Sequence, residues 1–165
     1  MTDPFDSDNT PVFKFALREG LDDSFLPTRG DSRDTGWDIR ATEDITLVPG
    51  QHAKIDTGIR VLSPEGWWLE LRPRSSSFAK HNLSFLYGVI DEGYENFIMI
   101  ACQYSPANSG CPPLQIKKGD RLGQLIPVKR QEMKVEMLSA EEFNSLSKER
   151  KSPRGLGGFG SSGVK

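Results

Sequence analysis

Residues 52–71, HAKIDTGIRVLSPEGWWLEL, decide the fold class of this chain. Apolar and polar side chains alternate over much of residues 52–62, which is the pattern of a β-strand with one face against a core. Pro64-Glu65-Gly66 is a turn signal, and the aromatic run at residues 67–71 favours a second strand. Two strands joined by a short turn predict β-structure in this part of the chain.

Further short apolar runs occur along the chain, each bounded by residues that favour turns. We expect additional strands at residues 12–17, 37–41, 45–48, 83–90, 97–104, 114–116 and 122–128. Residues 21–35, which are rich in Asp, Pro, Gly and Ser, are expected to form a loop. Many short strands separated by Gly and Pro turns are typical of a sandwich or a closed β architecture, so the sequence predicts an all-β fold.

One short helix is expected late in the chain. Ser139-Ala-Glu-Glu142 matches a capping box, in which the Ser side chain caps the helix and the Glu side chain reaches back to the Ser backbone. Phe143 and Leu146 would then share one face, and we favour a structural role for this helix at an edge of the domain. The expected organisation is a disordered N-terminus at 1–10, a β domain at 11–146, and a linker with a mobile Gly-rich arm at 147–165.

Composition excludes several classes of protein. The formal net charge of −2 in 165 residues provides no global basic field for nucleic acid or a membrane surface. Cys102 and Cys111 are too few for a disulfide scaffold and lack the spacing of a zinc site. The acidic start and the lack of a long apolar run argue against a signal peptide and a membrane span. We therefore expect a soluble protein of the cytoplasm, or of another reducing compartment.

The Gly-rich segment RGLGGFGSSG at residues 154–163 combines groups that suit a nucleotide. By composition alone it is typical of a flexible tail. However, the guanidinium fork of Arg154 suits phosphate oxygens, and glycines let backbone N–H groups converge on an anion. Phe159 offers a ring on which a base can stack, and Ser161 and Ser162 add hydroxyl donors. The combination predicts a lid that closes over a nucleoside triphosphate.

Two polar segments earlier in the chain are candidates for binding phosphate and a metal ion. The hydroxyls and backbone amides of Arg74-Ser-Ser-Ser77, followed by a helical turn, would suit a phosphate group. Asp38 lies in a strand-like run, where it would suit a hard cation held through water. For each segment alone, an ordinary exposed loop or strand position explains the residues as well.

Two later segments have similar alternatives. In GVIDEGY at residues 88–94, Asp91 would hold a water molecule and Tyr94 would offer a ring to a sugar, although a simple turn is equally consistent. Spacing alone does not decide between Asp91 and Glu92 as the functional carboxylate. In GDRLGQLI at residues 119–126, a turn followed by a buried strand accounts for everything except the polar Gln124 within an apolar run.

The candidate residues lie in five segments, which are, in chain order, TGWDIRA, PRSSSFAK, YGVIDEGY, GDRLGQLI and RGLGGFGSSG. With these segments in this order, the chain resembles the trimeric dUTPase family over residues 12–163. The resemblance implies a distorted jelly-roll-like (β-clip) fold and a homotrimer whose active sites are shared between subunits. It also implies Mg²⁺-dependent hydrolysis of dUTP to dUMP and pyrophosphate by attack of water on the α-phosphorus. That reaction limits uracil in DNA and supplies dUMP for dTMP synthesis.

The resemblance also implies a role for each matching residue. Asp91 would activate the attacking water, Tyr94 would pack against deoxyribose and exclude a 2′-hydroxyl, and Asp38 would meet Mg²⁺ through water. Phe159 would stack on uracil. The hairpin backbone that reads the uracil edge would comprise Phe85, Gly88, Val89, Ile90 and Met99. The phosphates would be bound by Arg74, Ser75, Ser76, Gln124, Arg154, Gly160, Ser161 and Ser162.

The sequence departs from the family pattern at several positions. The family usually has Gly two residues after the Tyr of the third motif, whereas Tyr94 is followed by Glu95-Asn96-Phe97. Leu86 and Tyr87 replace small residues before GVID. Milder changes are Ser76 in place of a common Gly, Trp37 in place of Tyr, and Ser-Ser in the arm. These changes affect the details of base recognition more than the reaction.

Three alternatives compete with this interpretation. A dCTP deaminase, or a bifunctional enzyme, shares the fold but needs a Glu on the strand after the third motif, where this chain has Ala101. The chain would otherwise be a dUTP-gated regulatory binding protein, or an unspecific β-sandwich module with a flexible tail. Ala101 and the Gly-rich arm with Phe159 favour a dUTPase over the deaminase. Asp91, Arg154 and Phe159 argue against a purely degenerate enzyme but leave an added regulatory role open, and deletion of the arm discriminates the third alternative.

Overall fold

The structure is a computed structural model of the chain that describes residues 10–151. It divides into two compact units, Met1–Gln131 and Glu132–Lys165. Most of the predicted N-terminal tail and the Gly-rich arm lie outside the described residues. The predicted boundaries at residues 10 and 146 stay predictions.

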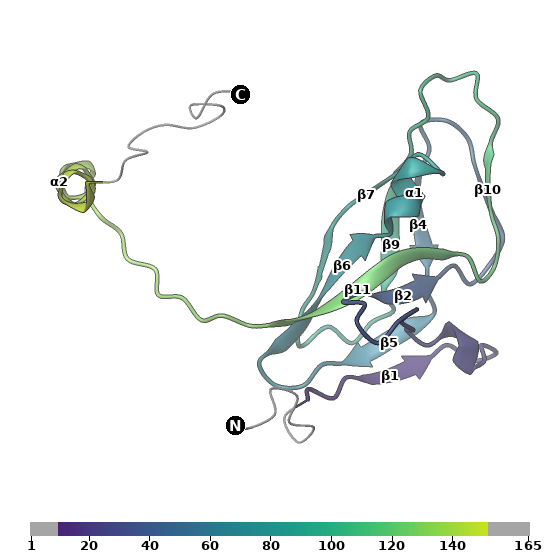
Figure 1. The fold of residues 1–165 in the computed structure, drawn as a ribbon, viewed down its shortest axis with the longest axis horizontal. Coiled ribbons are helices and arrows are strands. Elements are labelled where there is room, and N and C mark those ends of the chain that lie inside the picture. Colours follow the sequence, from purple (N-terminus) through teal and green to yellow (C-terminus); the bar gives the residue numbers. More distant parts are fainter. Residues whose placement is uncertain (1–9, 152–165) are drawn as a thin grey trace. The chain divides into compact units, whose positions relative to one another are not determined.

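The first unit is built of short β-strands (Figure 1). In chain order they are β1 Lys14–Leu17, β2 Trp37–Arg40, β3 Ile45–Leu47, β4 His52–Asp56, β5 Ile59–Leu62, β6 Trp67–Pro73, β7 Leu83–Phe85, β8 Gly88–Ile90, β9 Met99–Tyr104, β10 Leu114–Ile116 and β11 Arg121–Lys129. All pairs among these described strands are antiparallel. The predicted all-β, jelly-roll-like fold is confirmed.

The described strands form four sheets, and their buried side chains form one core cluster. The largest sheet has the strand order β2-β11-β6-β8, with β2, β11 and β6 side by side in Figure 1. A second sheet has the order β4-β9-β7, and the pairs β1-β5 and β10-β3 complete the fold. Because β11 lies between β2 and β6, three segments that are distant in the sequence meet at one sheet surface.

The core forms because side chains alternate across each strand. In β5, Ile59 and Val61 are buried while Arg60 and Leu62 face outward. In β9, Ile100 and Cys102 are buried on the same principle. Each fully buried aliphatic side chain stabilises the fold by roughly 1.5–3 kcal/mol relative to an exposed one.

The predicted continuous strand at residues 52–62 is wrong, because the chain changes partners in its middle. β4 pairs with β9, whereas β5 pairs with β1. Gly58 lies between them with a φ of +65°, and a Cβ at Gly58 would lie 2.3 Å from Leu21 Cδ1. The buried hydroxyl of Thr57 donates to the carbonyl of Ile98 at 2.7 Å. This break turns the chain from one sheet to the next.

The predicted strand at residues 83–90 is also interrupted. β7 pairs with β9 and β8 pairs with β6, so the two halves belong to different sheets and do not pair with each other. The break falls at Leu86 and Tyr87, whose side chains are 71% and 63% exposed. The Leu86 N–H still donates to the Ala101 carbonyl at 3.0 Å, which keeps the segment against β9.

Within residues 10–151, three helical elements accompany the strands. Asp23–Phe25 forms a 3₁₀ turn within the predicted loop, and α1 (Ser75–Ala79) provides the predicted helical turn after β6. α2 (Ala140–Arg150) confirms the capping box, since Ser139 Oγ accepts from Glu142 N and Ser139 N donates to Glu142 Oε2. No helix in the range 10–151 is both long enough and apolar enough to cross a membrane.

Candidate active site

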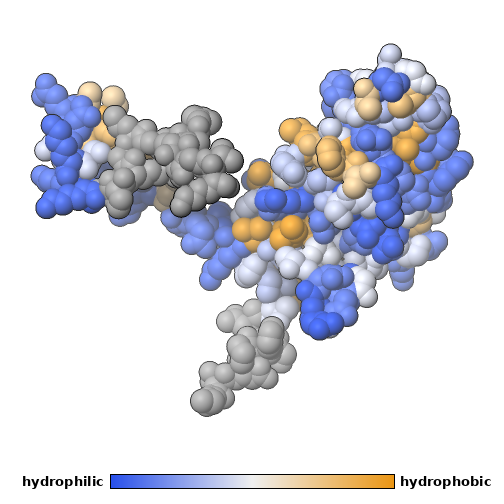
Figure 2. Space-filling model, turned by 45° about the horizontal axis from the view of Figure 1, so that its top comes forward, coloured by the Kyte–Doolittle hydropathy of each residue, from blue (hydrophilic) through white to orange (hydrophobic). Residues whose placement is uncertain are grey.

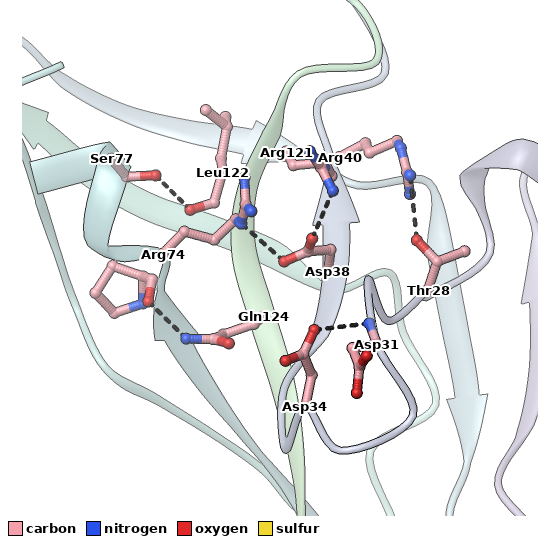
Figure 3. Close-up of polar contacts among 11 residues, drawn as sticks. Thr28, Asp31, Asp34, Asp38, Arg40, Arg74, Ser77, Arg121, Leu122 and Gln124 are labelled. Atoms are coloured by element: carbon pink, nitrogen blue, oxygen red, sulfur yellow. Dashed lines mark hydrogen bonds and ion pairs between the residues drawn. The ribbon is translucent and has the colours of Figure 1, made fainter. Parts of the chain in front are cut away.

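Residues of the first, second and fourth motifs line one cleft. β2 contributes Asp38, the β6–α1 junction contributes Arg74 and Ser75, and β11 contributes Arg121 and Gln124. The pairing of Gln124 with Asp38 and with Arg72 on its two neighbouring strands sets this arrangement. Figure 3 shows the side chains of Asp38, Arg74, Arg121 and Gln124 close together. The sheet order thus brings together groups that the sequence only suggested.

Asp38 is the charged centre of this cleft. Its side chain is largely buried, with the residue only 8% exposed, and its two carboxylate oxygens accept from Arg74 Nε at 2.8 Å and from Arg121 Nη1 at 3.2 Å (Figure 3). Burying an isolated carboxylate is costly, and the two guanidinium groups compensate its charge. The same two ion pairs hold Arg74 and Arg121 at the cleft. The net charge of the three groups together is positive.

Gln124 is held in place by the backbone of two other segments. Its Nε2 donates to the Pro73 carbonyl at 3.1 Å (Figure 3). On its other side it lies against Gly36, where an added Cβ would be 1.9 Å from Gln124 Oε1. Gly36 is therefore needed for the position of Gln124. Sequence reasoning overlooked Gly36 and Arg121, although both lie inside recognised motifs.

The three serines after Arg74 have different environments. Ser77 is fully buried and donates to the Leu122 carbonyl at 2.6 Å, so it anchors α1 to β11 (Figure 3). Ser75 is exposed and lines the cleft, whereas Ser76 is half-buried in the first turn of α1. Of the three serines, Ser75 is the one that lines the cleft.

Asp91 lies in a different groove of the same chain. It follows β8 in a turn in which Tyr94 N donates to Asp91 O at 3.0 Å. The groove is lined by Asp91 together with Trp67, Trp68, Val89, Glu92, Gly93 and Arg130. Asp91 is exposed, and its carboxylate forms no hydrogen bond or ion pair with residues 10–151. One chain by itself therefore does not bring Asp91 into the cleft of Asp38 and Arg74.

Glu92, in contrast, is bonded to two other segments of the fold. Its Oε2 accepts from Gly66 N at 2.9 Å and from Arg130 Nη1 at 2.6 Å. Gly66 precedes β6 and Arg130 follows β11, so Glu92 ties the turn to both strands. Of these two acids, Glu92 is bonded to the surrounding fold, whereas the Asp91 carboxylate is exposed and forms no bond with the described residues.

The positions expected to read uracil are distributed around the end of β8. Ile90 is buried, and Gly88 lies close to β6, where a Cβ would be 3.2 Å from Leu71 Cβ. Val89 lines the groove of Asp91, whereas Phe85 lines a separate apolar groove. Met99 is the partly exposed first residue of β9.

The environment of β9 argues against the deaminase alternative. Ala101 provides no carboxylate, and its neighbours Ile100 and Cys102 are buried apolar side chains. Burial raises the pKa of the Cys102 thiol from 9.0 to about 11, so this group is protonated and unreactive near neutral pH. Neither a proton shuttle nor a nucleophile is available on this part of β9.

No group of three or more His, Cys, Asp or Glu side chains among the described residues is arranged to hold a metal ion. Both oxygens of Asp38 already accept from arginine, although a carboxylate oxygen can accept more than one hydrogen bond. Asp38 would therefore fit Mg²⁺ only through an intervening water. The predicted arm residues Arg154, Phe159, Gly160, Ser161 and Ser162 lie outside the described residues.

Comparison with known proteins identifies the family. The family model described as dUTPase matches residues 22–163, most of the chain. The chain belongs to the dUTPase family. The cleft residues Asp38, Arg74 and Gln124 lie in the first, second and fourth motifs, and Asp91 lies in the third. The fold agrees with that of solved dUTPases.

Individual relatives support this membership. A deoxyuridine 5′-triphosphate nucleotidohydrolase of Thermobifida fusca is 34% identical over 163 residues, covering 95% of this chain and 84% of that protein. The mouse enzyme of the same name is 34% identical over 137 residues, covering 83% and 77%. The structure of a Staphylococcus phage 80alpha dUTPase mutant with dUpNHpp matches with a TM-score of 0.75 and 28% identity. The match covers 94% of this chain and 100% of the phage protein.

A second solved dUTPase provides information on metal binding. A point mutant of the dUTPase from phage phi11 of S. aureus, solved with a structural Mg(II) ion, matches with a TM-score of 0.68 and 25% identity. The match covers 77% of this chain and 96% of the phage phi11 protein.

Proposed function

We propose that this dUTPase-family chain hydrolyses dUTP to dUMP and pyrophosphate, with Asp91 orienting and deprotonating the water that attacks the α-phosphorus. The observation that carries this proposal is the contrast within one turn. Glu92 is neutralised by Arg130, whereas the carboxylate of Asp91 is exposed and unengaged among the described residues. A carboxylate that accepts a proton from water typically accelerates hydrolysis by about 10²–10⁴-fold.

The cleft of Asp38 supplies the electrostatic part of the reaction. A triphosphate is strongly anionic, so attack by water is favoured only when its charge is compensated. Arg74 and Arg121 face this cleft, and Ser75 and Gln124 add neutral donors beside them. These groups bind the phosphate chain and stabilise charge that moves to the leaving pyrophosphate. Ser76 would contribute through the first turn of α1.

A homotrimer would unite the two halves of the site. Asp91 and the Arg74 cleft lie in separate grooves of one chain, so a complete site requires a neighbouring subunit. The β-rich unit also carries apolar side chains at its surface among hydrophilic ones (Figure 2). Those more than half exposed include Val12, Val48, Leu62, Phe78, Leu86, Tyr87 and Val89. These side chains are available for burial against a neighbouring subunit.

The proposed cofactor is Mg²⁺ bound mainly by the triphosphate and by water, with Asp38 as an outer ligand. When bound, the ion neutralises phosphate charge and fixes the conformation of the triphosphate. Asp38 contributes by orienting a metal-bound water, while it holds Arg74 at the same cleft. The structural Mg(II) ion of the phage phi11 relative supports binding of Mg²⁺ by proteins of this family.

Base and sugar recognition complete the proposal. Backbone groups of Phe85, Gly88, Val89, Ile90 and Met99 read the uracil edge, and Tyr94 packs against deoxyribose. Phe159 stacks on the base while Arg154, Gly160, Ser161 and Ser162 bind the terminal phosphates. We place the reaction in the cytoplasm or another reducing compartment, which is consistent with two free thiols among the described residues.

The shared-site arrangement can be tested by mixing two inactive variants. Asp91→Asn removes one half of the site and Arg74→Ala removes the other. If each site combines residues of two subunits, mixed trimers contain some sites in which both mutations fall together and others in which neither does. Activity returns after subunits are mixed and reassembled. Mixed samples that stay inactive, despite verified exchange of subunits, would contradict the arrangement.

A panel of nucleotides tests the reaction itself. We expect pyrophosphate release in the presence of Mg²⁺ from dUTP, and little from dCTP, dTTP or UTP. Release of ammonia from dCTP, with no pyrophosphate from dUTP, would instead support the deaminase alternative.

A further inference from the structure

The segment after the third motif departs from the family pattern, and the structure shows how its residues are used. Phe97 belongs to the segment Glu95-Asn96-Phe97, which follows Tyr94 where the family usually has a Gly two residues after the Tyr. Two guanidinium groups lie over its ring, with Arg18 Cζ 4.5 Å and Arg60 Cζ 5.7 Å from the ring centroid. At these distances both cations are attracted to the face of the ring. Phe97 is thereby fixed, although its side chain is only half-buried.

Each of the two arginines is itself held in place. Arg60 lies on β5 between buried Ile59 and Val61, and its Nε donates to the Glu95 carbonyl at 2.7 Å. Arg18 forms an ion pair with Asp56 at the end of β4. The guanidinium of Arg60 thus contacts this segment twice, through the Glu95 backbone and through the ring of Phe97.

The next residue fixes the other side of Phe97. Ile98 is fully buried, its N–H donates to the Ile59 carbonyl at 2.8 Å, and its carbonyl accepts from Thr57 Oγ1 at 2.7 Å. The peptide between Phe97 and Ile98 is therefore constrained from both ends. The carbonyl of Phe97, which belongs to that peptide, has a defined position.

That carbonyl accepts a hydrogen bond from the Tyr94 hydroxyl at 3.0 Å. Tyr94 N also donates to Asp91 O at 3.0 Å, so the tyrosine is tied at its backbone and at the tip of its ring. Tyr94 is 37% exposed and can meet a ligand with one face of its ring. A phenol ring fixed at both ends keeps one orientation, whereas one fixed at its backbone alone samples several rotamers.

We propose that Arg60, assisted by Arg18, is a positioning residue for sugar selectivity. By holding the Glu95 backbone and the Phe97 ring, it acts together with the Ile98–Ile59 hydrogen bond to fix the carbonyl that holds Tyr94, and so keeps the Tyr94 ring where a 2′-hydroxyl would collide with it. The ligands distinguished are deoxyribonucleotides and ribonucleotides. This inference rests on the proposed function in one respect, because it takes Tyr94 as the residue that contacts the sugar.

The central test compares binding of non-hydrolysable α,β-imido analogues of dUTP and UTP to the full chain with Mg²⁺, by titration calorimetry. In Arg60→Gln, we expect the preference for the deoxy analogue to fall about tenfold, as the ring contact and the Glu95 hydrogen bond are both lost. Arg60→Lys should restore part of the preference, since its ammonium group can still donate to Glu95 and lie over the ring.

Lys14→Gln is the matched control. Lys14 lines the same surface groove as Arg60 and Glu95, and its loss removes one positive charge there. Within residues 10–151, the cations over the Phe97 ring are Arg18 and Arg60, so removal of Lys14 should leave the preference unchanged. An equal loss in Lys14→Gln and Arg60→Gln would show that the net charge of the groove is responsible, and would overturn the proposal.

A double mutant separates positioning from a general structural effect. Tyr94→Phe keeps the ring but removes the hydroxyl that the Phe97 carbonyl holds, so Arg60→Gln should change the preference little further in that background. A full additional tenfold loss there, or an unchanged preference in folded Arg60→Gln, would overturn the inference. Because binding alone is measured, a wild-type protein that binds with deoxy preference but does not hydrolyse dUTP would contradict the proposed reaction and not this role of Arg60.

Discussion

The Glu92 carboxylate lies 2.6 Å from the guanidinium of Arg130 and accepts a second hydrogen bond, from the N–H of Gly66. The two adjacent acids therefore have different roles, because only the carboxylate of Glu92 is bonded to the rest of the described fold. Glu92 connects the turn after β8 to the start of β6 and to the residue after β11. Asp91, one position earlier, is left exposed at the same turn. The fold therefore positions one carboxylate with the help of the other.

Replacement of Glu92 by Gln should reduce the turnover of dUTP only modestly. The amide oxygen can still accept from Gly66, and a partly exposed ion pair such as Glu92–Arg130 contributes about 0–1 kcal/mol. We expect kcat to fall by less than about tenfold, with the acid limb of its pH profile unmoved. Steady-state kinetics over a pH series measure both. A loss as large as that of Asp91→Asn would show that Glu92 acts directly on the substrate.

Gly36→Ala should disturb the phosphate cleft through Gln124. A Cβ at Gly36 would lie 1.9 Å from Gln124 Oε1 and 2.7 Å from its Cδ, so the amide must leave its position against Pro73. A displacement of this size near a reacting group costs roughly 10²-fold in kcat/KM. The control is Gln124→Ala, in which Gly36→Ala should have little further effect. If the two losses multiply in the double mutant, Gly36 acts by another route.

Burial of Cys102 predicts slow alkylation and a loss of stability in alkali. Its pKa is raised from 9.0 to about 11, so the fold favours the protonated thiol. Its contribution to stability is fully present below the unfolded value of 9.0, and is lost as pH rises toward 11, where the unfolded chain ionises first. Melting temperatures across this range should fall less in Cys102→Ala than in the wild type. Iodoacetamide should label half-buried Cys111 before Cys102, and the reverse order would contradict this environment.

Deletion of residues 154–165 should abolish turnover without unfolding the β-rich unit. Among the described residues, the buried core ends at Leu125, so the deletion removes no residue of that core. The segment carries Arg154 and Phe159, and closing a site over its substrate excludes water and fixes the reacting groups. We expect kcat to fall by at least about 10²-fold while the melting temperature stays unchanged. Full activity after deletion would show that the segment is only a tail.

Sequence patterns predicted most strands because burial on one face leaves a local signal. β10 was placed at its observed bounds and β11 within one residue at each end, since their apolar residues are contiguous and bounded by turns. The breaks at Gly58 and at Leu86–Tyr87 were not predicted. Each occurs where the chain exchanges one strand partner for another, and alternation of side chains does not record which strand lies alongside.

The site could be predicted only in part, for a similar reason. Gln124 gave a local signal, as a polar residue in an apolar run. The pairing of Asp38 with two arginines, the packing of Gly36 on Gln124 and the contact of Arg60 with Phe97 join residues far apart in the sequence. Such contacts exist only after the sheets have formed. The roles assigned to the arm stay predictions, because those residues lie outside the described range.

Pyrophosphate release from dUTP by wild type and by Asp91→Asn, measured side by side with Mg²⁺, tests the central claim most directly. Asn keeps the size of the side chain and its ability to orient water, but it cannot take up a proton. We predict rapid release by the wild type and a loss of about 10²–10⁴-fold in the variant, with dUTP-analogue binding retained. Hydrolysis that is unchanged in Asp91→Asn, or absent from the wild type, would contradict the account.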